Sequence, residues 1–299
     1  MIRVKIPATS ANLGPGFDCL GLALHLHNTI TVETDRPFQI SLTGPYTDGL
    51  PADESNLVWT TMCHFWDLIH YPTPSVALTF ENHIPPARGL GSSSAAIVGG
   101  LVAANTLAGS PYGKQQLLQV ANALEGHPDN VSPALYGGVT LSIPTEEGIL
   151  PRILAKSPKF KAVVLIPDTL LNTTKARGIL PPQVSRQDAV YNISHVGLLV
   201  EAFMREEYSL LKEGMRDVLH QNQRAALIPG LLETLEAALE AGAYGAALSG
   251  SGPTLIALIP DSSKLEVSQR MISMMGQYGI KAQAIELDID TQGATSAIT

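Results

Sequence analysis

The sequence predicts an α+β fold of two domains. The chain has 299 residues, a length that fits two domains of ordinary size. Segments with the two-residue alternation of strands are interleaved with segments of helical periodicity, and together they form two blocks. A polar, proline-bearing stretch at residues 145–159 separates the blocks. We therefore expect one domain at residues 1–155 and a second at residues 156–299.

The elements of the first block follow from local patterns. Residues 2–6 alternate apolar and polar side chains, as a half-buried strand does, and a loop of small residues follows at residues 9–21. The amphipathic segment at residues 114–125 stops at Gly126, a residue type typical of helix C-termini. The expected elements are strands at residues 2–6, 22–32, 76–80 and 139–143, and helices at residues 56–68, 95–107 and 114–125.

The second block has the same alternation of apolar strands and longer helical segments. A loop rich in glycine and serine, residues 245–253, leads into one of its strands. The expected elements are strands at residues 162–166, 254–259 and 281–287, and helices at residues 185–204, 231–241 and 264–278.

Composition and charge exclude several classes of protein. The chain carries 19 Lys and Arg against 27 Asp and Glu, a formal charge of −8, and such an acidic surface argues against a nucleic-acid partner. Its two cysteines, Cys19 and Cys63, have neither a disulfide pattern nor a metal-ligand spacing. The longest nearly apolar run, residues 95–104, is well short of the ~20 residues that span a bilayer. These features predict a cytoplasmic protein that does not enter a membrane.

Two histidines, His25 and His27, lie on the same face of the strand expected at residues 22–32. A His-x-His pair can bind a metal ion, but no third ligand is evident nearby in the sequence. We therefore expect this pair to form a solvated strand face.

One loop has the features of an anion site. It lies between a strand-like segment and a helix start, where backbone N–H groups and the helix dipole favour negative charge. Glycines allow close approach of a ligand, and serines can cap the helix, bind phosphate oxygens or ligate a metal. The loop is not a Walker A sequence, because no Gly-Lys-Ser/Thr follows. An ordinary serine-capped helix is the alternative. The candidate residues are Pro85, Pro86, Ala87, Arg88, Gly89, Leu90, Gly91, Ser92, Ser93, Ser94 and Ala95.

Three glycine-bearing segments, at residues 7–20, 85–95 and 246–254, together resemble the three motifs of the GHMP kinase superfamily. The first reads PATSANLGPGFD, and its closest resemblance is to the homoserine kinases. The stretches EGHPDNVSPALYGG at residues 125–138 and ALSGSGPT at residues 247–254 share that resemblance. The resemblance implies an N-terminal domain like domain 2 of ribosomal protein S5 and a ferredoxin-like C-terminal domain. It also implies ATP-dependent phosphorylation of a hydroxyl group.

The resemblance implies that the loop at residues 85–95 binds the phosphates of ATP. It further implies that one loop serine and Glu125 hold Mg²⁺, a hard cation that prefers oxygen ligands. Ser93 is the expected serine, with Ser92 and Ser94 as alternatives. Glu125 has a second interpretation as a solvated residue, although an acid in the last turn of a helix opposes the helix dipole. Arg88 is expected to face solvent, with contact to an ATP phosphate as the alternative.

The resemblance also implies a subsite for L-homoserine. Arg177 and Arg224 correspond to two arginines that bind the carboxylate, for which a planar guanidinium is well suited. The adenine pocket would lie near residues 56–58. The remaining positions that match substrate-contacting or acceptor-side residues are Asn12, Asp18, His127, Asp129 and Asn130.

Catalysis in such a kinase consists mainly of positioning and charge stabilisation. The residues expected to take part are Asn12, Asp18, Asn130 and Arg177. Because the Asn130 amide is a poor base, we expect the hydroxyl to attack without a side-chain general base. A mevalonate- or sugar-type acceptor and a catalytically silent ligand sensor are the alternative functions. The resemblance suggests a homodimer.

Overall fold

The computed structural model describes residues 1–171, 173–260 and 264–298. Within this part of the chain, seven strands form a first sheet in the order β11-β1-β2-β4-β3, with β5 paired to β2 and β6 paired to β5. Only the β3–β4 pairing is parallel, because the long loop between these strands lets the chain return in the same direction. The strands are β1 (Ile2–Ala11), β2 (Leu20–Thr34), β3 (Gln39–Thr43), β4 (Val76–Glu81), β5 (Val139–Thr145), β6 (Gly148–Ala155) and β11 (Thr295–Ile298).

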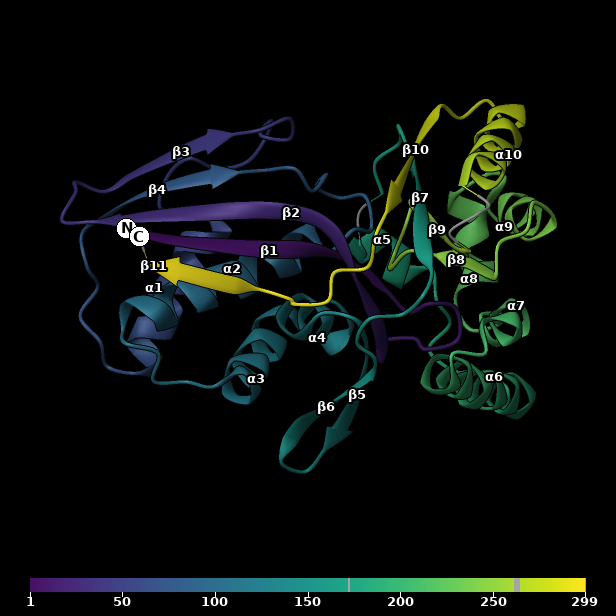
Figure 1. Ribbon diagram of the computed structural model, residues 1–299, viewed down its shortest axis with the longest axis horizontal. Helices are drawn as coiled ribbons and strands as arrows, with labels where there is room; N and C mark the ends of the chain where they lie inside the picture. The colour runs from purple at the N-terminus through teal and green to yellow at the C-terminus, as the bar shows by residue number, and fades with distance from the viewer. Residues whose placement is uncertain (172, 261–263, 299) are drawn as a thin grey trace.

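Four helices cover one face of the first sheet (Figure 1). They are α1 (Leu57–Leu68), α2 (Ser92–Leu107), α3 (Lys114–Glu125) and α4 (Pro128–Tyr136). The central helix, α2, is apolar on nearly all sides and is buried among the others. Its Gly99 and Gly100 permit this close packing, since a Cβ at Gly99 would lie 2.5 Å from the Ile30 side chain.

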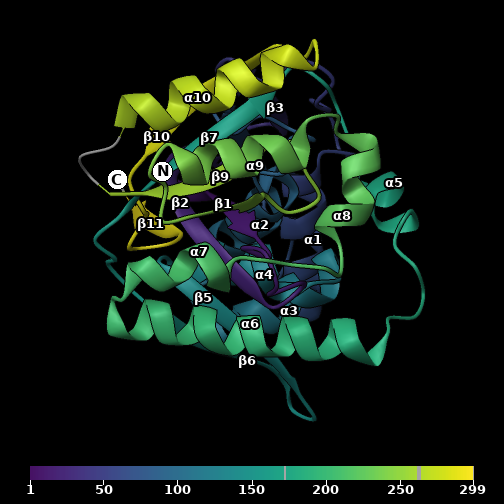
Figure 2. The same cartoon turned by 90° about the vertical axis from the view of Figure 1, so that its right-hand side faces the viewer.

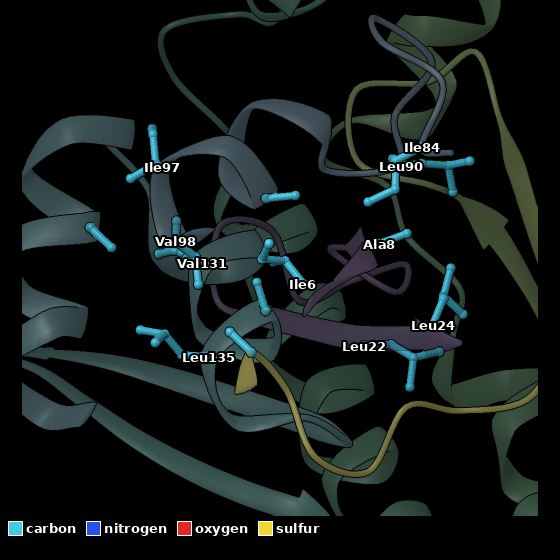
Figure 3. Close-up of a cluster of buried hydrophobic side chains, with 14 of the residues drawn as sticks. Ile6, Ala8, Leu22, Leu24, Ile84, Leu90, Ile97, Val98, Val131 and Leu135 are labelled. Carbon is cyan, nitrogen blue, oxygen red and sulfur yellow. The ribbon is translucent and has the colours of Figure 1, made fainter. Parts of the chain in front are cut away.

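The core between β1, β2, α2 and α4 holds the start of α2 in place (Figure 3). Burial of a large aliphatic side chain stabilises a fold by about 1.5–3 kcal/mol, so this cluster makes the region rigid. The buried side chains of β1 and β2 are Ile6, Ala8, Leu22 and Leu24, and those of the two helices are Ile97, Val98, Val131 and Leu135.

The second sheet is antiparallel, with the order β10-β7-β9-β8. This order, with helices α9 and α10 packed on one face, is that of a ferredoxin-like domain, as expected (Figure 2). Its strands and main helices are β7 (Lys161–Pro167), β8 (Gly245–Leu248), β9 (Leu255–Ile259), β10 (Ala282–Leu287), α9 (Leu231–Glu240) and α10 (Lys264–Gln277). The remaining helices are α5 (Thr173–Gly178), α6 (Arg186–Arg205), α7 (Leu211–Gly214) and α8 (Gln221–Arg224), with 3₁₀ turns at Tyr208–Leu210 and Ala225–Leu227.

After β10 the chain leaves the second sheet and returns to the first, where β11 pairs with β1 (Figure 1). We call residues 288–298 the C-terminal strap. The two termini consequently lie side by side at the edge of the first sheet. The strap therefore attaches the C-terminal end of the chain to the first sheet, which also contains the N-terminal strand β1.

Several local expectations were wrong. The stretch at residues 145–159 was expected to separate the two blocks and no strand was predicted in it, but it contains β6, which forms a hairpin with β5. Helix α2 begins at Ser92, three residues before the expected start, so the serines are its first turn. The short helix α4 was not expected, because Pro128 and Pro133 lie within it. Proline at the first helical position is well tolerated.

Among the described residues, no helix is long and apolar enough to span a membrane.

Candidate active site

The start of α2 presents free backbone amides. Gly91, the residue before the helix, has φ +68°, and a Cβ there would lie 1.9 Å from the Thr9 hydroxyl. The first intrahelical bond runs from the Ala95 N–H to the Gly91 carbonyl. In the described chain, no backbone or side-chain acceptor binds the N–H groups of Ser92, Ser93 and Ser94. Three such amides at a helix N-terminus are suited to an anion.

Glu125 lies at this same helix start. It is the last residue of α3, which Gly126 ends in the left-handed conformation. Its Oε1 accepts hydrogen bonds from the Ser93 hydroxyl at 2.8 Å and from the Ser94 hydroxyl at 2.6 Å. Ser93 is exposed and Ser94 is buried. A carboxylate and a serine hydroxyl side by side form the kind of oxygen-ligand pair that Mg²⁺ takes from a protein.

A cavity of about 500 Å³ opens in front of these amides. Its volume is in the range of small-molecule sites, and both polar and apolar groups line it. One part is apolar and includes the region expected to hold adenine. The apolar and amide-bearing residues in this part are Ile30, Leu42, Leu50, Pro51, Asn56, Leu57, Val58, Phe80 and Asn82.

The other part of the cavity contains most of the predicted site residues. The predicted residues that line the cavity are Asn12, Pro86, Ala87, Arg88, Gly89, Gly91, Ser92, Ser93, Ala95, Glu125, His127, Asp129, Asn130, Arg177 and Arg224. Pro85, Leu90 and Ser94 are buried, and Leu90 is part of the hydrophobic core. The sequence therefore located the cavity wall, although not every loop residue faces the cavity.

Hydrogen bonds join the three motifs to one another. The Gly250 N–H donates to the Ala11 carbonyl at 3.1 Å, and the Asn12 side-chain amide donates to the Gly250 carbonyl at 3.0 Å. Ser249 contacts the Gly89 carbonyl at 2.6 Å and the Ser10 hydroxyl at 2.8 Å. A carbonyl only accepts, so Ser249 donates to Gly89 and accepts from Ser10. The third motif, residues 246–254, thus holds the motifs at residues 7–20 and 85–95 in place through these hydrogen bonds.

The first turn of α4 supplies an acidic and an amide side chain. Asp129 is 2% exposed, and its Oδ1 accepts a hydrogen bond from His127 Nδ1 at 2.8 Å. Asn130 accepts a hydrogen bond from the Thr9 hydroxyl at 2.8 Å. Burial by itself would lower the pKa of His127, but the hydrogen bond to Asp129 and its negative charge outweigh this effect, so the pKa is raised.

Arg177 and Asp18 form a bidentate ion pair. The two guanidinium nitrogens of Arg177 lie 3.0 and 2.6 Å from the Asp18 carboxylate oxygens. The hydrogen bond to Asp18 is the main reason that the pKa of Arg177 is raised. Asp18 is not among the described residues that line the cavity, so the pair presents its arginine side to a ligand. Both residues are partly exposed, at 37% for Arg177 and 33% for Asp18, so the pair can open when a ligand competes.

Arg224 is buried, and no carboxylate of the described residues is in hydrogen-bond contact with it. Only 1% of it is exposed, and it donates to the carbonyls of Ala176 at 3.2 Å and Gly250 at 3.0 Å. No hydrogen bond joins its Nη2 to another described residue. Burial, and then repulsion from Arg177, lower the pKa of Arg224 to about 10. A buried cation at a cavity wall is stabilised by an anionic ligand.

His220 holds Arg224 in place and was not predicted from the sequence. Its Nε2 donates to the Gly14 carbonyl at 2.8 Å, so its Nδ1 is free to accept from Arg224 Nη1 at 3.2 Å. Burial lowers the pKa of His220, which keeps the ring neutral. The His-x-x-x-Arg spacing of His220 and Arg224 was the sequence signal that could have indicated their contact. The other partner of His220, Gly14, is more than 200 residues away in sequence, so no local pattern indicates that bond.

Arg88 is half-buried and bonded to other protein groups, rather than solvated as expected. Its guanidinium donates hydrogen bonds to the carbonyls of Pro167 and Thr169 at the end of β7. Arg88 lines the cavity, and the hydrogen bonds of its guanidinium connect the loop at residues 85–95 to the second sheet. This contact connects segments about 80 residues apart, so no local pattern reveals it.

Comparisons with known proteins agree with this geometry. The family model described as GHMP kinases N terminal domain matches residues 56–138, and the one described as GHMP kinases C terminal matches residues 199–277. The homoserine kinase of Desulfitobacterium hafniense is 57% identical over 294 residues, covering 98% of this chain and 99% of that protein. The homoserine kinase of Carboxydothermus hydrogenoformans is 42% identical and covers all of this chain and 97% of its own.

Solved structures give the same result. The crystal structure of homoserine kinase from Cytophaga hutchinsonii superposes with a TM-score of 0.89 at 30% identity, covering 99% of this chain and 97% of that one. Mevalonate kinase from L. major, in complex with R-mevalonate, has a TM-score of 0.71 at 15% identity over 95% of each chain and shows the shared fold. The chain belongs to the GHMP kinase family, whose members are ATP-dependent kinases that act on an alcohol. Its relatives of high identity along the whole chain are homoserine kinases.

Proposed function

We propose that this protein transfers the γ-phosphoryl group of ATP to the hydroxyl of L-homoserine, forming O-phospho-L-homoserine for threonine biosynthesis. The observation that carries the proposal is that one cavity contains both an amide-lined helix start and two arginines. The amides suit a polyphosphate, and the arginines suit the carboxylate of an amino acid. The identity to homoserine kinases along the whole chain supports the same acceptor.

The residues fit a nucleotide and its metal ion. The unpaired amides of Ser92–Ser94 would bind the phosphates, and Ser93 with Glu125 would hold Mg²⁺. Ser93 is favoured over Ser94 because it lines the cavity, whereas Ser94 is fully buried. Bound ATP would supply the phosphoryl group, and Mg²⁺ held there would neutralise negative charge on the phosphates.

The amino-acid end would lie opposite the phosphates. Arg224 and Arg177 would bind the carboxylate, and Asp18 or Asp129 would accept from the ammonium group. Asn12 and the αL turn around it hold Asp18 in place, because the side-chain Oδ1 of Asn12 accepts a hydrogen bond from the Asp18 N–H at 3.0 Å. His127 and Asn130 complete the acceptor side.

We infer that no side chain removes the hydroxyl proton before attack. The Asn130 amide cannot accept a proton at neutral pH, and its oxygen is already bonded to Thr9. Asp129 is bonded to His127, whose raised pKa makes a share of the imidazole cationic near neutral pH. The residues therefore act by placing the hydroxyl and stabilising charge, which is sufficient for a loose transition state.

One assay tests the function. ADP release is measured with ATP, Mg²⁺ and, in separate reactions, homoserine, threonine, mevalonate and galactose. We expect release with homoserine and little with the others. Release with mevalonate or galactose instead would show a different acceptor, and no release with any of them would indicate a ligand sensor on the kinase fold.

Glu125→Gln tests the metal site. The change keeps the shape of the side chain and removes its charge, so we expect the Mg²⁺ concentration for half-maximal activity to rise by about tenfold or more. Ser93→Ala should also raise the Mg²⁺ concentration for half-maximal activity. Activity is measured as a function of Mg²⁺ at fixed ATP, with the exposed Glu146→Gln as the control. An unchanged Mg²⁺ profile for Glu125→Gln would contradict the assignment.

Asp129→Asn tests the absence of a general base. General-base catalysis contributes about 10²–10⁴-fold, so loss of a true base would reduce kcat by that range. We expect a smaller fall in kcat and a rise in the KM of homoserine. Asp48→Asn, at an exposed loop position, is the matched control. A kcat lower by several orders of magnitude with unchanged KM values would identify Asp129 as the base.

The division into domains at residues 1–155 and 156–299 and the homodimer both stay predictions. Light scattering of the purified protein measures the oligomeric state directly.

A further inference from the structure

The His-x-His pair on β2 has a third potential ligand that lies far away in sequence. His25 and His27 meet Asp290 of the C-terminal strap, and the three ligand atoms lie within 4.8 Å of one another. Among the described residues this is the one group of three His, Cys, Asp or Glu side chains with such spacing. The expectation of a solvated strand face was wrong for His27, which is 10% exposed.

An irregularity in the sheet brings the two histidines together. The β1–β2 register pairs Pro7 with His27 and Ala8 with Leu24, so His25 and Leu26 form a bulge with no partner on β1. Bulges redirect side chains, and here the two imidazole rings lie edge to face with centroids 4.6 Å apart. Both rings can consequently present a nitrogen to the same point.

The strap fixes the carboxylate of Asp290. Its Oδ1 accepts hydrogen bonds from the Gln292 and Gly293 amides at 2.9 and 2.6 Å, which leaves Oδ2 for the histidines. The strap is itself held to the fold, since the His25 N–H donates to the Asp288 carbonyl and the Asp290 N–H donates to the Ala23 carbonyl. An oriented carboxylate with its other oxygen already bonded is a usual feature of metal sites.

We propose that His25, His27 and Asp290 bind a divalent transition-metal ion of the zinc class. Asp290 Oδ2 lies 2.8 Å from His27 Nε2 and 4.0 Å from His25 Nδ1. Ligand atoms around tetrahedral zinc lie about 3.3 Å apart, given bond lengths of about 2.0–2.1 Å. The exposed side chain of His25 can move to bring its 4.0 Å separation from Asp290 to this ligand spacing. A water molecule would be the fourth ligand of the metal ion. Two imidazoles and one carboxylate favour Zn²⁺ over the oxygen-seeking Mg²⁺.

The ion would act as a cross-link rather than in the kinase reaction. None of the three side chains is among the described residues that line the cavity. The strap contacts the end of α4 through bonds from the Gly138 N–H to the Asp290 carbonyl and from the Ala294 N–H to the Ala134 carbonyl. A metal here would thus link β2 to the strap, which in turn contacts the helix that carries Asp129.

Zinc binding to the full chain, purified without a histidine tag, tests the proposal. Titration calorimetry with Zn²⁺ and no nucleotide should show one site that His25→Gln weakens by about tenfold or more. Zn²⁺ should also raise the Tm of the wild-type protein and raise that of His25→Gln less, because only the folded state has the site. His25 is exposed, and the recorded contacts of its side chain are the 4.0 Å approach to Asp290 and the edge-to-face contact with the His27 ring, so this variant should fold normally.

Matched variants separate this site from others. Glu125→Gln should keep the Zn²⁺ site, and His64→Gln, which changes an exposed histidine on α1, should leave the affinity unchanged. His27→Gln should weaken binding as His25→Gln does. Equal Zn²⁺ affinity in the wild type and His25→Gln, or no binding by the wild type, would overturn the proposal.

Discussion

His220 is the residue whose role is clearest from its hydrogen bonds alone. The Gly14 carbonyl can only accept, so the His220 proton is on Nε2, and Nδ1 accepts from Arg224. No carboxylate of the described residues is in hydrogen-bond contact with Arg224, so the neutral His220 ring orients its guanidinium together with the Ala176 and Gly250 carbonyls. His220 is therefore a positioning residue for the proposed carboxylate site.

His220→Gln should raise the KM of homoserine by about tenfold, equivalent to ~1.4 kcal/mol, and leave the KM of ATP unchanged. Glutamine can still donate to Gly14, but it removes the imidazole acceptor of Arg224 and leaves only the Ala176 and Gly250 carbonyls to orient the guanidinium. His220→Asn, whose polar atoms lie nearer the Nδ1 position, should have a smaller effect. Steady-state kinetics with each substrate varied separately measure both values, and equal rises in the two KM values would point to general loss of structure.

At the same scale, residue types on the chain were good guides to the candidate site. Asn12, Glu125, Asp129, Asn130 and both arginines were assigned from short motifs, and the structure brings them to one cavity. The motifs did not reveal the pairings between them. The Arg177–Asp18 ion pair joins residues 159 positions apart, and only the folded chain brings them together.

At the scale of elements, the start of α2 depends on glycine. Gly91→Ala introduces a Cβ into the Thr9 hydroxyl at a residue with φ +68°. The conformational strain alone costs about 1–3 kcal/mol, and the clash must shift the first turn whose amides are proposed to bind phosphate. We expect a lower free energy of unfolding and a KM for ATP raised by about tenfold or more.

Gly109 provides the matched control. It has φ +82°, and nothing lies within 4 Å of a Cβ built there, so Gly109→Ala has the strain without the clash. Urea unfolding and ATP-dependent kinetics of the two variants separate these contributions. If the KM of ATP rises equally in both, the proposed phosphate site at Gly91 is wrong.

Element prediction succeeded where periodicity was regular. The helix at residues 114–125 has the predicted bounds, because its amphipathic pattern ends at a glycine that adopts φ +88°. The strand β6 was missed because its buried and exposed side chains do not alternate, and its pairing with β5 stabilises it. The strand β11 was missed for a similar reason, since all four of its residues are exposed.

At the scale of the whole molecule, the two sheets meet at Ser249. Its hydroxyl, fully buried, connects the strand β1, the loop at Gly89 and the turn after β8. Ser249→Ala would leave the Gly89 carbonyl and the Ser10 hydroxyl without this partner, at a cost of about 1–3 kcal/mol. We expect reduced stability and reduced activity together, because the three motifs would lose the hydrogen bonds that fix their relative positions.

Urea unfolding of Ser249→Ala, compared with Ser157→Ala at an exposed position, measures this cost. A difference between the two variants smaller than about 0.5 kcal/mol would show that the turn holds its position without the serine.

The sequence by itself determined the fold class, the three motifs and the residue types of the candidate site, because periodicity and short motifs are local properties of a chain. Tertiary structure decided which residues meet: Arg177 with Asp18, Arg224 with His220, and the β2 histidines with Asp290. Each of these contacts joins segments that belong to different elements, and the Asp290 contact spans 263 positions. Such contacts form only when burial of the two hydrophobic cores fixes the relative positions of the elements.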